Sequence, residues 1–236
     1  MKITEAIILA GGLGTRLRSA VPDLPKCMAP VAGKPFLSFV IHYCMKQGIE
    51  RFIFSLGYKH KVIEKYIDKE FPTMNGAFCV EEEPLGTGGA IQMACEFART
   101  NQVMILNGDT LFSVNAEQLA GFHFSNDADC TLSLKPMKKM DRYGVVELND
   151  KGVVTHFKEK QFYESGNING GVYALNVERF LARQLPPKFS FEKDYLEAFI
   201  AQHKFYGQVQ DEYFIDIGIP EDYERANTEL NHASKD

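Results

Sequence analysis

The sequence predicts an α/β protein with a Rossmann-like, mixed but mostly parallel sheet that is flanked by helices and carries a small β-rich lobe. The first eighty residues alternate apolar, strand-like runs with segments of helical periodicity, which is typical of a parallel sheet covered by helices. After Asp129 the pattern changes to strand pairs separated by turn residues, which predicts antiparallel hairpins. The chain has 236 residues, of which 45% are apolar, so it can bury a substantial core.

The expected elements of the first half follow one another closely. An apolar run at 6–10 predicts a buried strand. Residues 35–48 predict a helix with Pro35 in its first turn and Gly48 after its end. The remaining expected elements are a strand at 52–56, a helix at 59–71, a strand at 77–80, a glycine-rich loop at 81–90, a helix at 90–99 and a central strand at 103–109.

The second half is expected to be richer in antiparallel strands. Its expected elements are a strand at 129–136, a hairpin of 143–148 with 153–159, a strand at 166–176, a helix at 190–203, and a final strand and helix within 213–227. The chain contains no internal repeat, low-complexity run or long linker. We therefore expect residues 1–236 to form a single domain.

Charge and cysteine content exclude several classes of protein. The net charge of -5 and the pI near 5.7 argue against a nucleic-acid-binding surface, so any phosphate site must be a local positive pocket. Five cysteines without a C-x-x-C pair disfavour both a disulfide framework and structural zinc. No apolar run approaches the ~20 residues of a membrane-spanning helix or resembles a signal-peptide core. These features indicate a cytoplasmic protein without membrane or nucleic-acid partners.

The segment Leu9–Arg18, with sequence LAGGLGTRLR, is the first candidate site. Glycines directly after a strand allow backbone N–H groups to surround an anion, because no Cβ blocks the approach. The spacing fits neither a P-loop, which needs a Lys-Ser/Thr pair, nor a dinucleotide fingerprint, whose third glycine is replaced by Leu17. A plain turn is the alternative interpretation. Arg16 and Lys26 in an acidic protein favour anion binding.

Several polar residues have two interpretations. Asp109 and Asp216 each follow an apolar run and could be turn residues, but together they would form the oxygen environment that Mg²⁺ uses beside substrate phosphates. Cys27 is interpreted as a small buried residue rather than a nucleophile. The pair Glu159-Lys160 could be solvated, and the segment 169–171, Asn-Gly-Gly, could be a β-bulge.

The available chemistry indicates phosphoryl or nucleotidyl transfer. The sequence has no G-x-S-x-G elbow and no Ser/His/Asp arrangement for acyl transfer. It does offer cations, glycine backbone and two aspartates, which are the groups that such a transfer requires.

The chain resembles the sugar-1-phosphate nucleotidylyltransferases over nearly its whole length. The motifs that carry the resemblance, in the family's order, are LAGGLGTRL with the later Lys26, EEPLGTGGA, NGD, RYG, EK, NGG and YFIDIG. The resemblance implies a Rossmann-like catalytic domain, with a nucleotide-binding half at about 1–125 and a sugar-phosphate-binding half at about 126–236. It also implies a nucleoside triphosphate and a sugar 1-phosphate as substrates, Mg²⁺ as cofactor, and release of pyrophosphate. Dimers and tetramers are common in the family, so the resemblance allows a homo-oligomer.

The same resemblance implies roles for individual residues. Catalysis would involve Arg16, Lys26 and Asp109. The nucleotide side would comprise Leu9, Gly11, Gly12, Gly14, Thr15, Arg16, Lys26, Glu83, Pro84, Gly86, Thr87, Gly88, Asn107 and Asp109. The sugar-phosphate side would comprise Tyr143, Gly144, Glu159, Lys160 and Asn169. The metal ligands would be Asp109 and Asp216.

Within the family, the segments DRYGVV, EKQF, INGGVY, FSFE and YFIDIGIPEDY are similar to those of guanylyltransferases that act on a heptose 1-phosphate. This similarity favours GTP and D-glycero-α-D-manno-heptose 1-phosphate as substrates. A uridylyltransferase of N-acetylmuramate 1-phosphate and a guanylyltransferase of mannose 1-phosphate are the nearest alternatives. An alternative of another class is a non-catalytic regulatory subunit that binds a nucleotide sugar. Cys27 stands where the family often has proline.

Overall fold

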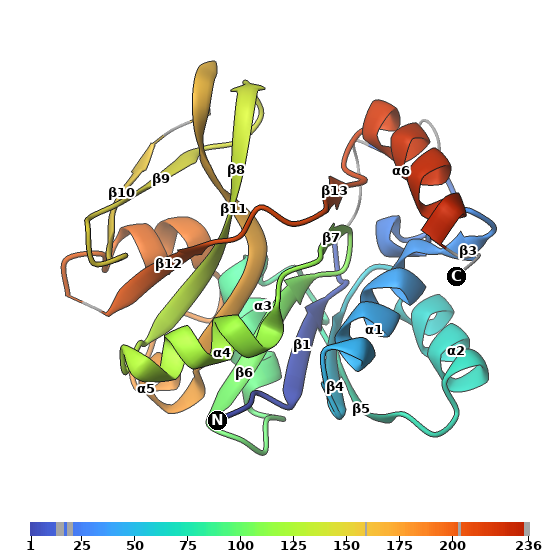
Figure 1. Ribbon diagram of the computed structural model, residues 1–236. Coiled ribbons are helices and arrows are strands. Elements are labelled where there is room, and N and C mark those ends of the chain that lie inside the picture. The colour runs from blue at the N-terminus through green and yellow to red at the C-terminus, as the bar shows by residue number, and fades with distance from the viewer. Residues whose placement is uncertain (13–16, 18–20, 159, 203, 234–236) are drawn as a thin grey trace.

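A computed structural model describes the chain at residues 1–12, 17, 21–158, 160–202 and 204–233. Its centre is a nine-stranded mixed sheet, in which seven strands follow the order β10-β9-β11-β6-β1-β4-β5 while β8 pairs with β11 and β12 (Figure 1). The strands are β1 (Glu5–Leu9), β4 (Arg51–Leu56), β5 (Asn75–Val80), β6 (Gln102–Asn107), β8 (Cys130–Met140), β9 (Val145–Leu148), β10 (Val154–Lys158), β11 (Tyr163–Asn176) and β12 (Phe205–Val209).

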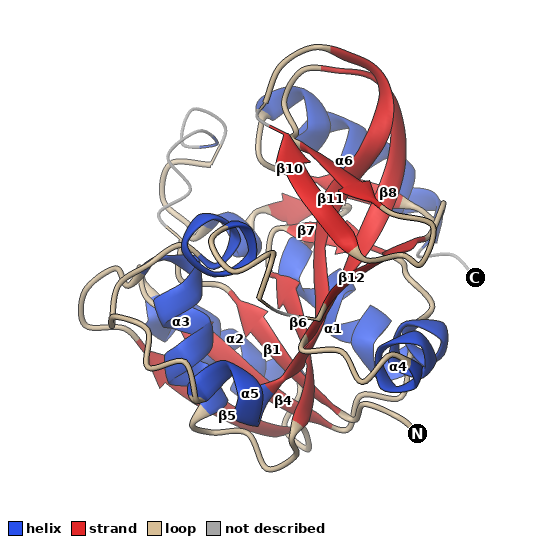
Figure 2. Ribbon diagram, turned by 90° about the vertical axis from the view of Figure 1, so that its left-hand side faces the viewer, coloured by secondary structure: helices blue, strands red, loops and turns tan. Residues whose placement is uncertain are grey.

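Helices cover both faces of this sheet. The helical elements are α1 (Phe36–Lys46), α2 (His60–Glu70), α3 (Gly86–Cys95), α4 (Ala116–Ser125), α5 (Val177–Leu181), the π-helix η3 (Phe191–Glu197) and α6 (Pro220–Ala233). In β1, Ile7 and Ile8 are both fully buried but belong to different cores, because successive side chains of a strand point to opposite faces. The Ile7 core contains α3, α5 and η3, while the Ile8 core contains α1, α2, α4 and α6 (Figure 2).

The long strand β11 joins the parallel part of the sheet to the β-rich lobe. Its residues 172–176 pair antiparallel with β6, and its earlier residues pair with β8. β9 pairs with β11 at Ile168 and with β10 along its length, so these strands continue the sheet into the β-rich lobe (Figure 1). Met140, Val145 and Ile168 form a separate small core there. The predicted α/β class, the mixed sheet and the β-rich lobe are therefore confirmed.

Two short antiparallel ribbons were not expected from the sequence. β7 (Thr110–Phe112) pairs with β13 (Phe214–Asp216), and β2 (Pro30–Val31) pairs with β3 (Lys34–Pro35). The 3-10 turn η2 (Lys26–Met28) precedes the second ribbon. The β7–β13 ribbon lies between β11 and α6 (Figure 1).

Some predicted boundaries are wrong. α3 begins at Gly86, four residues before the predicted start, so its glycines lie within the helix. Glycine is needed at these positions because the neighbouring chain leaves no room for a side chain. A Cβ on Gly88 would lie 2.2 Å from the Phe189 ring, and one on Gly89 would lie 2.2 Å from the Pro187 carbonyl oxygen. The predicted helix at 190–203 is the shorter π-helix η3, while α4, α5 and β12 were not predicted.

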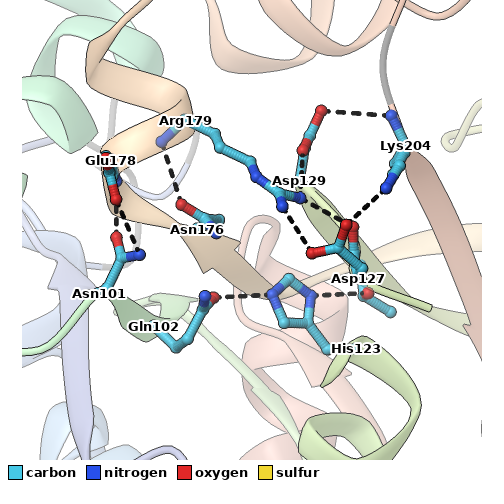
Figure 3. Close-up of polar contacts among 10 residues, drawn as sticks. Asn101, Gln102, His123, Asp127, Asp129, Asn176, Glu178, Arg179 and Lys204 are labelled. Atoms are coloured by element: carbon cyan, nitrogen blue, oxygen red, sulfur yellow. Dashed lines mark hydrogen bonds and ion pairs between the residues drawn. The ribbon is translucent and has the colours of Figure 1, made fainter. Parts of the chain in front are cut away.

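A balanced group of charges ties the amino-end edge of the sheet together. This Arg179 cluster consists of Asp127, Asp129, Arg179 and Lys204 (Figure 3). The guanidinium of Arg179 lies 2.5 Å from Asp127 and 2.9 Å from Asp129, and Lys204 Nζ lies 2.5 Å from Asp127. The cluster therefore connects the segment after α4, the start of β8, helix α5 and the start of β12.

All five cysteines are buried and free, so none forms a disulfide. Burial, with a smaller contribution from Asp109, raises the pKa of Cys27 to about 12, which keeps this thiol protonated and supports its interpretation as a packing residue. Among the described residues, no helix combines the length and the apolar character needed to cross a membrane.

Candidate active site

Two adjoining cavities open where the parallel strands end. In β1 and β6, the paired residues Leu9 and Asn107 are the last of their strands, so the turns that follow lie at one edge of the sheet. The first cavity has a volume of about 740 Å³. The predicted residues that line it are Leu9, Gly11, Gly12, Glu83, Pro84, Gly86, Thr87, Asn107 and Asp109.

Close backbone packing builds one side of the first cavity. A Cβ on Gly57 would lie 2.9 Å from the carbonyl oxygen of Gly11, and the N–H of Tyr58 donates to that oxygen at 3.3 Å. Sequence reasoning missed Gly57 and Tyr58, which both line the cavity. The segment SLGY, at the end of the predicted strand 52–56, could have indicated these residues, because glycine at a strand end often marks a close approach of the backbone.

Glu81 braces the loop that forms the other side of the first cavity. Its carboxylate accepts the N–H of Leu85 at 2.9 Å and the hydroxyl of Ser55 at 3.4 Å. These bonds hold the 81–85 loop against the end of β4. The neighbouring Glu82 and Glu83 line the cavity itself, so carboxylates contribute to its wall.

Thr87 stands on the wall that both cavities share. Its hydroxyl donates to Glu192 at 2.7 Å and accepts the N–H of Phe191 at 2.9 Å. The start of η3 is thereby attached to the first turn of α3. Gly88 does not line either cavity; it packs against Phe189, whose carbonyl oxygen accepts its N–H at 3.0 Å.

The second cavity, of about 520 Å³, lies between the β-rich lobe and η3. The predicted residues that line it are Thr87, Asn107, Tyr143, Gly144, Lys160, Asn169 and Asp216. Sequence reasoning missed four charged residues of its lining, which are Lys158, Glu192, Lys193 and Glu197. The FSFE motif, which ends at Glu192, was the available signal for the η3 residues. The lining holds three lysines and three carboxylates, and Lys158 also pairs with Glu147, so Lys160 and Lys193 are the cations that a phosphate group could contact here.

The Asn-Gly-Gly segment of β11 forms a bulge beside the second cavity. The pairing of β11 with β8 shifts register between Asn169 and Tyr173. Gly171 has a φ of +71°, and a Cβ there would lie 2.5 Å from the Asn107 amide nitrogen. The Asn169 amide donates to the Tyr173 hydroxyl at 2.8 Å, and its oxygen accepts the N–H of Gly171 at 3.1 Å. Bulge, close packing and cavity lining thus coincide at this segment.

Lys26, a predicted nucleotide-binding residue, lines neither cavity but links one carboxylate of each. Its Nζ lies 2.5 Å from Asp109, which lines the first cavity, and 3.3 Å from Asp216, which lines the second. We call these three residues the Lys26 cluster. The Ile217 N–H donates to the Asp109 carbonyl oxygen at 3.1 Å, which fixes the two aspartates side by side.

The Lys26 cluster fits a hard divalent cation. Two carboxylates converge on a single ammonium atom, so their oxygens already face a common point. The formal charges of two carboxylates and one ammonium leave one negative charge in excess, and Mg²⁺ prefers one or two carboxylates together with substrate phosphate oxygens. No group of three or more His, Cys, Asp or Glu side chains suited to a metal occurs in the described part of the chain.

Tyr143 connects the lobe to this cluster. Its hydroxyl lies 3.5 Å from Asp216, and its ring packs edge-on against Phe214 with centroids 6.0 Å apart. Arg142 lies over the same ring and pairs with Asp222 at 2.6 Å. Burial first, and then the charge of Asp216, raise the pKa of Tyr143 well above its usual range, so it stays a neutral hydrogen-bond donor.

Four predicted site residues lie outside the described residues: Gly14, Thr15, Arg16 and Glu159. Their assignments stay predictions.

Comparisons with known proteins agree on one family. The protein-family profile described as "Nucleotidyl transferase" matches residues 5–233. The chain is 52% identical to a D-glycero-α-D-manno-heptose 1-phosphate guanylyltransferase from Aneurinibacillus thermoaerophilus, over 97% of this chain and 99% of that protein. It is 44% identical to the enzyme of the same name from Campylobacter jejuni, over 93% of this chain and 96% of that protein.

Comparison with solved structures indicates the same family. The crystal structure of HddC from Yersinia pseudotuberculosis has a TM-score of 0.88 and 38% identity, covering 97% of this chain and 100% of that chain. The structure of HddC complexed with GMP-PN has a TM-score of 0.86 and 37% identity, with the same coverage.

Proposed function

The chain belongs to the nucleotidyl transferase family, and we propose that it joins GTP to D-glycero-α-D-manno-heptose 1-phosphate, yielding the GDP-sugar and pyrophosphate. Relatives with this activity in their names align with it over nearly their whole lengths. The observation that carries the proposal is the position of Lys26, which binds one carboxylate from each of two adjoining cavities. An enzyme that joins two phosphorylated substrates needs charged groups at the place where its two binding cavities adjoin.

We assign GTP to the first cavity. Gly11 and Gly12 would lie along the triphosphate, and the loop at 83–87 would contact the ribose and base. Guanine presents its N1–H and 2-amino groups as adjacent donors, and the carboxylates of Glu82 and Glu83 suit that edge. On the predicted assignment, Gly14, Thr15 and Arg16 complete the triphosphate site, with Arg16 on the leaving pyrophosphate.

We assign the sugar 1-phosphate to the second cavity. Lys160 would face its phosphate, with Lys193 adding positive charge to the same cavity. The predicted contacts of Tyr143, Gly144, Glu159 and Asn169 would then involve the sugar.

The reaction requires little general-base catalysis. A phosphomonoester has a second pKa near 6, so the attacking oxygen is already largely ionised at neutral pH. That oxygen forms a bond to the α-phosphorus of GTP, while the bond from the α-phosphorus to the bridging oxygen breaks and pyrophosphate leaves. The main barrier is the repulsion between two anions. Lys26 and Lys160 would reduce it from opposite sides and hold the substrates in line.

The resident metal would be Mg²⁺, held by Asp109 and Asp216. When bound, it would neutralise developing charge on the phosphate oxygens. The chain's own contribution is to keep the two carboxylates converged, through Lys26 and the β7–β13 ribbon.

Pyrophosphate release tests the proposal. The purified chain with Mg²⁺ is incubated with each of GTP, UTP, ATP and CTP, in combination with heptose, mannose and N-acetylmuramate 1-phosphates. We expect turnover to be fastest with GTP and the heptose phosphate. Faster turnover with another pair would reassign the substrates. Binding of a nucleotide sugar without any turnover would indicate the non-catalytic alternative.

A matched pair of lysine variants tests the second cavity. Lys160→Gln should raise the KM for the sugar phosphate about tenfold, with little change in the KM for GTP, because it removes one charge-assisted contact. Lys151→Gln, in the exposed turn between β9 and β10, is the control and should leave both constants unchanged. Equal effects of the two substitutions would remove Lys160 from the phosphate site.

A further inference from the structure

A third cavity, of about 520 Å³, lies among β3, α1, α6 and the β7–β13 ribbon. Its lining shares no residue with the first or second cavity. It is as large as the cavity that we assign to the sugar phosphate, so it can hold a small organic molecule. Neither the proposed reaction nor the Lys26 cluster uses it.

Two lysines give the third cavity an excess of positive charge. Lys34 lies just before α1 and Lys46 lies in its last turn, and both line the cavity. Within the described parts of the chain, neither lysine forms an ion pair. This excess is unexpected in a protein with a net charge of -5.

The carboxylate in the lining does not balance these lysines. One oxygen of Glu229 accepts the Tyr213 hydroxyl at 2.7 Å, and the other lies 3.3 Å from Arg225 Nε. The apolar part of the lining comes from Phe39, Leu111 and Leu230. A ligand that fits would therefore combine an anionic group with an apolar ring.

The third cavity is mechanically connected to the Lys26 cluster. The β7–β13 ribbon pairs Leu111 with Ile215 and Thr110 with Asp216. Its outer end is closed by the Ser113 N–H, which donates to the Tyr213 carbonyl oxygen at 2.9 Å, and both of these residues line the third cavity. At about 3.3 Å per residue, the outer end lies roughly 10–13 Å along the ribbon from the two aspartates.

We propose that the third cavity is a regulatory site for an organic phosphate that carries an apolar ring, and that its occupancy shifts the Lys26 cluster through the β7–β13 ribbon. A phosphomonoester carries a charge of about -1.5 to -2 at neutral pH, which matches the two lysines. The ring would pack against Phe39 and Leu111. The coupling rests on the proposed function of the Lys26 cluster, whereas the binding does not.

Fluorescence can follow binding at this cavity alone. The chain has no tryptophan, so Phe39→Trp places a single indole in the lining. The full-length variant is titrated with phenyl phosphate, with inorganic phosphate, and with benzylammonium, which has a similar ring but the opposite charge. We expect saturable binding of phenyl phosphate, at least tenfold weaker binding of inorganic phosphate, and no binding of benzylammonium.

Charge removal provides the matched comparison. Adding Lys34→Gln and Lys46→Gln should weaken phenyl phosphate binding at least tenfold, while Lys65→Gln on the exposed face of α2 should not change it. Equal binding of phenyl phosphate and benzylammonium, or no effect of the two lysine substitutions, would overturn the proposal. A fluorescence change that follows protein concentration rather than added phenyl phosphate would also overturn it, because it would assign the cavity to a contact between two copies of the chain.

Linkage tests the coupling. If phenyl phosphate changes the affinity of the Lys26 cluster for Mg²⁺ and GTP, these ligands must change the affinity for phenyl phosphate by the same factor. We expect its Kd to change at least fivefold when Mg²⁺ and GTP are present, and this change to disappear in Asp109→Asn. An unchanged Kd would overturn the coupling. Failure of the proposed reaction would be distinguishable, since it would abolish pyrophosphate release without affecting the titration.

Discussion

Two clusters of charged side chains occupy opposite edges of the same sheet, and they differ in charge balance. The Arg179 cluster has two carboxylates and two cations that bind one another (Figure 3). The Lys26 cluster has two carboxylates, one ammonium and an opening to two cavities. A cluster whose charges balance stabilises the fold. A cluster with an excess negative charge beside a cavity can bind a further cation. On our proposal, the difference separates a structural edge from a catalytic edge.

The largest expected effect lies at the catalytic edge. Asp109→Asn should reduce kcat for pyrophosphate release roughly 10³-fold, because on our proposal it removes a ligand of the metal that offsets phosphate charge. The thermal midpoint should change little, because the substitution removes the excess negative charge of the Lys26 cluster while Lys26 keeps Asp216 as a partner. Steady-state kinetics at saturating Mg²⁺ measures the loss. The same substitution at the other edge, Asp129→Asn, is the control, and a comparable kcat loss there would erase the distinction between the edges.

A pH effect is expected at the structural edge. His123 is fully buried between Thr131 and Gln102 at 2.9 Å from each, and burial lowers its pKa to about 4 (Figure 3). Below pH 6.5 the unfolded chain binds a proton at this residue that the native chain does not, so stability falls as the pH falls from about 6.5 to about 4. Over this pH range the free energy of unfolding decreases by about 3 kcal/mol.

Urea unfolding at pH 7 and pH 4.5 measures this dependence. His123→Gln should reduce the difference in unfolding free energy between pH 7 and pH 4.5. His156→Gln, on the exposed surface of β10, should leave that difference unchanged. A pH dependence that is identical in His123→Gln and the parent chain would show that this imidazole does not titrate on unfolding.

A smaller effect is expected from Asp129→Asn. The Asp129 side chain is 10% exposed and pairs with Arg179, so losing its charge should cost about 2 kcal/mol of unfolding free energy. For a chain of this size, that lowers the thermal midpoint by roughly 6 °C. Scanning calorimetry measures the shift, and kcat should stay within about twofold of the parent value. A reduced kcat with an unchanged midpoint would reverse the roles assigned to the two edges.

Local patterns predicted the parallel half of the fold. Apolar runs gave β1, β4 and β6 to within two residues, because these strands are almost fully buried, while the start of the edge strand β5 was predicted two residues late. The residue pattern left open whether Asp109 and Asp216 meet, and only the family resemblance paired them as metal ligands; in the structure Lys26 contacts both.

The remaining elements and site residues depend on long-range contacts, which the local sequence does not reveal. The first turn of α3 requires glycine because Phe189, about a hundred residues later in the chain, packs against Gly86 and Gly88, whereas the local sequence alone indicated a loop. Lys193 reaches the second cavity because the 189–192 segment bonds to the first turn of α3. Helix α4 was missed because its sequence, AEQLAGFHFS, lacks a clear apolar stripe.

Metal binding tests the central claim most directly. Mn²⁺, a paramagnetic substitute for Mg²⁺, is titrated by electron paramagnetic resonance into the chain with GTP present and sugar phosphate absent. We expect Mn²⁺ binding to be at least tenfold weaker in Asp109→Asn and in Asp216→Asn than in the parent chain, and unchanged in Asp129→Asn. Equal Mn²⁺ affinity in all four proteins would contradict the claim that the Lys26 cluster holds the metal.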